Sequence, residues 1–227
     1  MSLWSRISDA LSALASGESL ATVFERLRTP PERRVAFAIA VIALSAKMAK
    51  ADGLVTRDEV TAFREVFHIP KEDEKSAARV FNMAREDVAG FEEYATRIAA
   101  MFRDDPAVLS DLLEGLFHIA AADGTYHPKE EQFLERVATI FGISQRDFTI
   151  LRARHIPDAI PDPYTVLGVD PDQSLDEIKT EWRRQIRATH PDQMMARGVP
   201  QEAIKLAERR LVAINQAWED ISTHRGA

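Results

Sequence analysis

Cysteine is absent from the 227 residues of this chain, which excludes disulfides, thiolate nucleophiles and zinc sites with cysteine ligands. A basic excess is absent too, because 36 aspartates and glutamates outnumber 29 lysines and arginines and the formal net charge is −7. Proteins that bind nucleic acid through its phosphates usually carry a basic patch, so we expect no nucleic-acid partner. The lack of cysteine agrees with a reducing compartment, and we expect a cytoplasmic protein.

Long hydrophobic runs are also missing. The most apolar stretch covers the twelve residues from Val35 to Ala46. As a helix it would extend only about 18 Å, against roughly 30 Å of bilayer hydrocarbon. The first twenty residues lack the basic start and unbroken apolar stretch of a secretory signal. We therefore expect a buried core helix at this stretch and no transmembrane span.

Residues 1–28 are predicted to contain an N-terminal amphipathic helix. Its apolar stripe consists of Leu3, Ile7, Leu11 and Leu14. This stripe favours packing on the domain that follows, and the alternative is peripheral contact with the inner membrane or with a partner. The polar face carries Arg6 as its cation beside Asp9, which weakens the membrane interpretation.

Helical periodicity dominates the rest of the chain and no alternating strand pattern is visible, so we predict an all-α fold. An internal repeat lies within residues 29–154, where residues 47–63 and 118–134 share Ala-Asp-Gly followed by a glutamate. A period of this length is typical of a duplicated helical hairpin rather than a solenoid. We predict one helical bundle over residues 29–154.

Four acidic residues recur at matching positions of the two repeats: Asp52, Glu59, Asp123 and Glu130. The favoured interpretation is that the glutamates cap helices and the aspartates serve the adjoining turns. The alternative is a site for a divalent cation, because four carboxylates suit a hard metal. The loop of residues 52–59 lacks the alternating oxygen ligands of an EF-hand. We expect no required cofactor.

A domain boundary is predicted at residues 155–162, since Pro157, Pro161 and Pro163 prevent a helix from continuing there. Residues 163–227 then show a short turn of helix and two amphipathic helices, one at about 174–189 and one after Pro200. A polar loop joins the two helices, so we expect an antiparallel hairpin.

Charge placement on the first of these helices is distinctive. Lys179, Arg183 and Arg187 are four residues apart and share one face, and Arg184 lies further round. Such a run alone is typical of a solvated helix face. At its end stands His190-Pro191-Asp192, and the position of this tripeptide in the loop of a hairpin, after a basic helix, is much more specific than the three residues themselves.

This segment resembles the J-domain of DnaJ-type co-chaperones. The matching residues are Tyr164-x-x-Leu167-Gly168-Val169, Glu177-Ile178-Lys179, Trp182-Arg183, His190-Pro191-Asp192 and Ile214-Asn215-x-Ala217-Trp218. The run Ala196-Arg197-Gly198-Val199-Pro200-x-Glu202 is similar to the DjlA-type branch, and the repeats upstream are similar to the TerB-like helical domain that precedes the J-domain in that branch.

The resemblance implies a partner and an activity. It implies that the chain binds a DnaK-class chaperone and promotes ATP hydrolysis by that partner. His190, Pro191 and Asp192 would be the activating motif. The docking residues would be Lys179, Arg183, Arg184 and Arg187. The TerB-like domain would provide partner choice or location.

Three departures from the family pattern are visible. Gln193 stands where the family often has lysine, and we expect slightly weaker docking. The sequence also shows neither the N-terminal membrane span typical of the DjlA type nor a further helix after Ile221.

Other functions fit less well. An enzyme with His190 as base and Asp192 as its orienting group would need a nucleophile and a pocket, so we expect no enzyme. A helix-turn-helix DNA reader is disfavoured by the acidic residues around the basic helix. The alternative that remains is a metal-binding TerB-like stress-response or interaction module to which the J-domain is only an accessory. The sequence leaves the client protein and the oligomeric state open.

Overall fold

The computed structural model describes residues 33–52, 90–122, 126–156, 162–200 and 205–226, with residue 124 and scattered positions between 6 and 26 and between 75 and 82. For residues 33 and 49–52 it describes the backbone alone. Over these residues the chain forms helices and no strand, as predicted. The helices are α3 (Arg33–Asp52), α6 (Phe91–Met101), α7 (Pro106–Ala120), α8 (Pro128–Phe141), α9 (Gln145–His155), α10 (Pro163–Leu167), α11 (Leu175–Thr189), α12 (Pro191–Ala196) and α13 (Lys205–His224).

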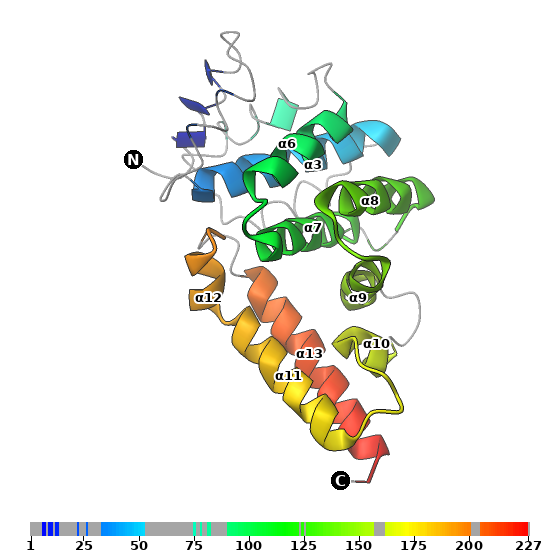
Figure 1. Cartoon of the computed structure of the whole chain (residues 1–227). Helices are drawn as coiled ribbons and strands as arrows, with labels where there is room; N and C mark the ends of the chain where they lie inside the picture. Colours follow the sequence, from blue (N-terminus) through cyan, green and yellow to red (C-terminus); the bar gives the residue numbers. More distant parts are fainter. Residues whose placement is uncertain are drawn as a thin grey trace.

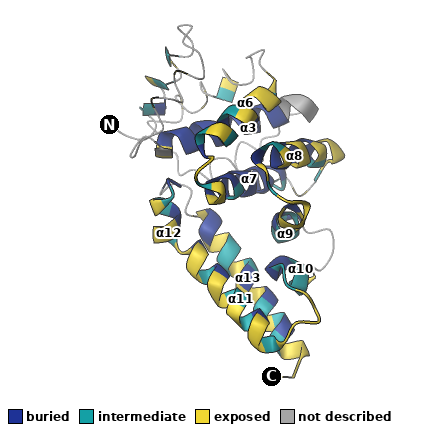
Figure 2. Cartoon of the chain, viewed as in Figure 1, coloured by how far each residue is buried: buried dark blue, intermediate teal, exposed yellow. Residues whose placement is uncertain are grey.

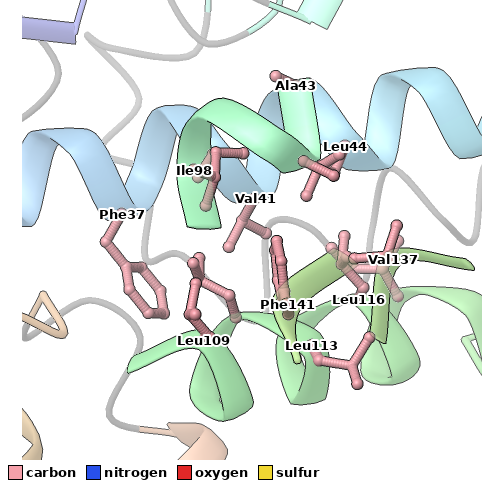
Figure 3. Packing of buried hydrophobic residues seen from close by; sticks show 14 of the residues in the cluster. Phe37, Val41, Ala43, Leu44, Ile98, Leu109, Leu113, Leu116, Val137 and Phe141 are labelled. Carbon is pink, nitrogen blue, oxygen red and sulfur yellow. The ribbon is translucent and has the colours of Figure 1, made fainter. Parts of the chain in front are cut away.

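Helices α3 to α9 form an N-terminal bundle, and α10 to α13 form a C-terminal unit that we call the hairpin (Figure 1). The core of the bundle is built around α3, whose residues 35–48 are all buried (Figure 2). The prediction of a buried core helix at Val35–Ala46 is therefore confirmed. Phe37 and Val41 point from α3 towards Leu109 of α7 (Figure 3).

Local signals explain where the bundle helices begin and end. Helix α8 starts with Pro128 at its first position, and the Glu130 carboxylate accepts a hydrogen bond from the backbone N–H of His127. It ends at Gly142, whose φ of 72° suits glycine. Helix α9 follows almost directly, because the Ser144 hydroxyl accepts a hydrogen bond from the backbone N–H of Asp147.

The hairpin has its own smaller core. Ile178 of α11 packs with Ile214 and Ile221 of α13, and Leu167 of α10 covers the seam. The rings of Trp182 and Trp218 stack with centroids 5.2 Å apart at the edge of this core. The predicted antiparallel arrangement of the two helices is present (Figure 1).

The loop between α11 and α13 differs from the prediction. Pro191 ends α11 but also begins the short helix α12, because a proline is favoured at a first helical position. Met194 and Val199 of this segment are fully buried, so the connection is a packed element rather than a polar loop. Helix α9 was likewise not predicted.

Candidate functional site

The tripeptide His190-Pro191-Asp192 lies at the corner between α11 and α12. His190 is both the residue at which α11 ends and the cap of α12, where its Nδ1 accepts a hydrogen bond of 3.2 Å from the backbone N–H of Asp192. The neutral ring then carries its proton on Nε2. The side chains of His190 and Asp192 are 61% and 76% exposed, so one donor and one carboxylate face solvent at the end of the hairpin.

Three of the four predicted docking residues share one face of α11. Lys179, Arg183 and Arg187 follow one another at intervals of one helical turn, and we call them the cationic strip. Arg183 and Arg187 are exposed and Lys179 is half-buried. In the parts of the chain that the structure describes, none of the three has a carboxylate partner, so their charges are available to a binding partner.

Arg184 is separated from the cationic strip. Its guanidinium makes a two-pronged ion pair with Glu181, with Nε–Oε2 and Nη2–Oε1 distances of 2.7 and 2.6 Å. This hydrogen bonding raises the pKa of Arg184 and lowers that of Glu181. Both residues line an open cleft of about 900 Å³ between α11 and the bundle helices α7 and α9. The structure thus does not bring Arg184 together with the other three predicted residues.

Comparison with known proteins agrees with this two-part organisation. Residues 38–153 match the family "Tellurite resistance protein TerB" and residues 162–225 match the DnaJ domain. Several relatives are named "Co-chaperone protein DjlA". The one from Photobacterium profundum is 26% identical over 86% of this chain and 80% of its own length, the one from Coxiella burnetii 29% over 77% and 72%, and the one from Escherichia coli 24% over 86% and 82%.

The chain belongs to the family of DjlA-type co-chaperones. Its N-terminal bundle is the TerB domain and its C-terminal hairpin is the J-domain. No solved structure matches the chain significantly.

Sequence reasoning missed a group of charged residues between the two domains. Asp111 and Glu114 of α7 are fully buried. Arg197, after α12, lies 3.0 Å from Asp111, and Arg210 of α13 lies 2.7 Å from the same carboxylate and also pairs with Glu114. We call these four residues the interdomain cluster. Arg197 belongs to the run that resembles the DjlA branch, but nothing in the sequence indicated its partner in α7.

Two histidines lie beside the interdomain cluster. His155 Nε2 is 3.0 Å from Glu114 Oε1, and His118 contacts the guanidinium of Arg209. Burial, together with the nearby Arg209 and His155, lowers the pKa of His118 to about 3. Burial, with the nearby Arg154 and Arg209, lowers the pKa of His155 to about 3. Both rings are therefore neutral at physiological pH.

A second set of hydrogen bonds connects α9 to the J-domain. Arg154 donates to the Val166 carbonyl at 3.0 Å and to Gln185 at 2.8 Å, and Arg146 donates to the Gly168 carbonyl. Burial lowers the pKa of Arg154 to about 10, which still leaves it charged at neutral pH. Gly168 ends α10 with a φ of 65°, which favours glycine, and a Cβ atom there would collide with the side chain of Ile150.

The predicted metal residues are largely outside the described part of the chain. This applies to Glu59, to Asp123 and to the side chain of Asp52. Glu130 is buried, and its carboxylate accepts the His127 N–H at 2.8 Å, as the capping interpretation expects. Among the residues that the structure describes, no group of three or more potential metal ligands occurs.

The predicted N-terminal helix is described at a few positions only. Leu3, Leu11 and Leu14 lie outside the described residues. Ile7 is fully buried in the core of the TerB domain, and Ala10 and Ala13 are packed against the same core. This agrees with packing of the N-terminal segment on the domain. Of the helices described, none is long and apolar enough to cross a bilayer.

Proposed function

We propose that this co-chaperone binds a DnaK-class chaperone through the cationic strip and stimulates its ATPase through His190-Pro191-Asp192. The observation that supports this most strongly is the exposure of His190 and Asp192 at the end of the helix whose three cations have no carboxylate partner among the described residues. A partner that docks along α11 on an acidic surface would meet the tripeptide at the end of that helix.

The charges and the tripeptide are suited to different steps. Exposed cations contribute less than about 1 kcal/mol each but accelerate association with an oppositely charged surface. The complex can therefore form and dissociate in each cycle. Once the partner is docked, His190 offers a donor at Nε2 and Asp192 an acceptor. We propose that ATP hydrolysis occurs in the partner, that the chain catalyses no reaction of its own, and that it needs no cofactor.

The TerB domain has a separate proposed role, which is to select the partner or the location of the activity. The packing of Ile7 in its core supports a role of the N-terminal segment in the domain itself. A cytoplasmic location follows from the proposed chaperone partner, and contact of the N-terminal segment with the inner membrane stays a prediction.

The decisive variant is His190→Gln in the full chain. We expect it to fold normally and to lose stimulation in a single-turnover ATPase assay with DnaK, because the ring is exposed and makes only a local contact. His224→Gln is the matched control, since His224 is also an exposed J-domain histidine but is the last residue of α13 and not part of the tripeptide. Full stimulation by the His190 variant, or none by the natural chain, would contradict the proposal.

A further inference from the structure

The segment after the tripeptide packs on the TerB domain rather than on the J-domain. Met194, Val199, Leu206 and Ala207 belong to the core of the bundle, whereas the core of the J-domain is formed by other residues of α10, α11 and α13. A Cβ atom on Gly115 of α7 would lie 3.6 Å from Leu206, so the start of α13 lies against α7. The end of the J-domain that carries the tripeptide is thus built into the TerB domain.

The interdomain cluster fixes this end by directional contacts. One oxygen of Asp111 is bound by Arg197 and the other by Arg210. Glu114 receives Arg210 on one oxygen and His155 on the other. Each carboxylate therefore has both oxygens engaged, and such charge-assisted bonds in a buried site define the position of their partners well.

Arg197 connects this cluster to the tripeptide. It is the residue at which α12 ends, and α12 begins at Pro191 with His190 as its cap. A second nitrogen of Arg197 donates to the carbonyl of Ala188 near the end of α11 at 3.3 Å. Along the chain, only the six residues of α12 separate His190 from Arg197. Moving its end at Arg197 therefore moves its start at the tripeptide.

We infer that Arg197 is a positioning residue for the activating tripeptide, and that the TerB domain acts on the partner's ATPase through Asp111. This inference rests on the proposed function and adds to it a role of the TerB domain in the activity itself. The domain sets the orientation in which His190 and Asp192 meet the docked chaperone, while the cationic strip alone sets docking strength.

The test measures the DnaK ATPase rate against the concentration of the full chain. A positioning defect lowers the plateau of this curve, because docked complexes are less active. A merely structural defect reduces the amount of folded protein, which shifts the curve to higher concentration and leaves its plateau unchanged. The variants are Arg197→Gln, Asp111→Asn and the double variant. Arg136→Gln is the control, since it breaks the exposed pair with Glu92 on the TerB domain, away from the J-domain.

We expect each single variant to lower the plateau about threefold to tenfold, with a half-saturating concentration that changes less than about twofold. The double variant should match the lower single variant, because the two residues act through one contact. Arg197→Lys keeps the charge but has one terminal nitrogen instead of a fork, and should give an intermediate plateau. Unchanged plateaus, or losses that multiply in the double variant, would overturn the inference.

A second measurement does not depend on the chaperone. The backbone N–H groups of Gln193 and Met194 bond to the His190 carbonyl within α12. Their hydrogen exchange should be faster in Arg197→Gln than in the natural chain and unchanged in Arg136→Gln. Equal exchange would overturn the inference by itself. A natural chain that does not stimulate DnaK would instead reject the proposed function and leave this exchange result to decide on the positioning of α12.

Discussion

Reversal of two charges on the cationic strip tests how the J-domain docks. In Arg183→Glu/Arg187→Glu the strip changes from three positive charges to one positive and two negative. An exposed ion pair contributes about 0.2–1 kcal/mol, and each reversal replaces such an attraction by a repulsion of similar size. Two reversals should therefore weaken association by about 1–4 kcal/mol, with a central value near a thirtyfold rise in Kd.

The assay is DnaK binding measured between about 50 and 300 mM NaCl, where the Debye length falls from roughly 14 to 6 Å. The Kd of the natural chain should rise with salt, and the reversed variant should lose most of this dependence. Lys129→Glu/Arg136→Glu is the matched control, because both residues are exposed on α8 and the change in net charge is identical. Equal weakening in the control would show that net charge, rather than the strip, controls binding.

Arg184 separates the structure from the sequence pattern in the same assay. It is paired with Glu181 and faces the interdomain cleft, so Arg184→Gln should weaken DnaK binding less than Arg183→Gln does. Equal weakening by the two substitutions would return Arg184 to the docking face and would contradict the assignment of the strip to the other three residues.

Three further predictions concern stability. Ile178→Ala should lower the free energy of unfolding by about 2–5 kcal/mol in urea titrations, because Ile178 is fully buried in the J-domain core; a loss below 1 kcal/mol would deny it a central place. Since the pKa of His155 is lowered to about 3 on folding, the unfolded chain binds the extra proton, and stability should fall as pH drops from about 6.5 towards 3. The contribution of His155 is at most about 1.4 kcal/mol per pH unit, and His155→Gln should reduce the slope by that contribution. Glu130→Ala should cost about 1 kcal/mol through the lost cap, equally with and without a chelator, whereas a chelator effect confined to the natural chain would favour a metal there.

Sequence patterns predicted the helices whose signals are local. Ser174 and Glu177 are three residues apart, the spacing of a capping box, and the structure contains both bonds of that motif, at 3.3 and 2.8 Å. The start of α9 carried a comparable signal, because Ser144 stands three residues before Asp147, yet that helix was not predicted. A serine three residues before an aspartate is a frequent pattern, and here it marks the start of a helix only because the Ser144 hydroxyl caps the Asp147 N–H.

The interdomain cluster had no local signal at all. Asp111 is separated from Arg197 by 86 residues and from Arg210 by 99, and a buried carboxylate in an otherwise apolar helix shows only that some partner must exist. Arg184 shows the reverse limit. Lys179, Arg183 and Arg187 share one face of α11, as their four-residue spacing predicts. Arg184 was placed among the docking residues by the family resemblance, and its pairing with Glu181 depends on side-chain geometry.

The packing of α12 changes what the division into two domains means. The family boundaries follow the sequence, with the TerB match ending at residue 153 and the DnaJ match beginning at 162. The hydrophobic cores are divided differently, because Met194 and Val199 lie within the J-domain sequence but in the TerB core. A J-domain cut at the family boundary would therefore expose these side chains and leave Arg197 and Arg210 without their carboxylates. Reduced activity of such a fragment would report the loss of this packing, so the contribution of the TerB domain has to be measured by substitutions in the full chain.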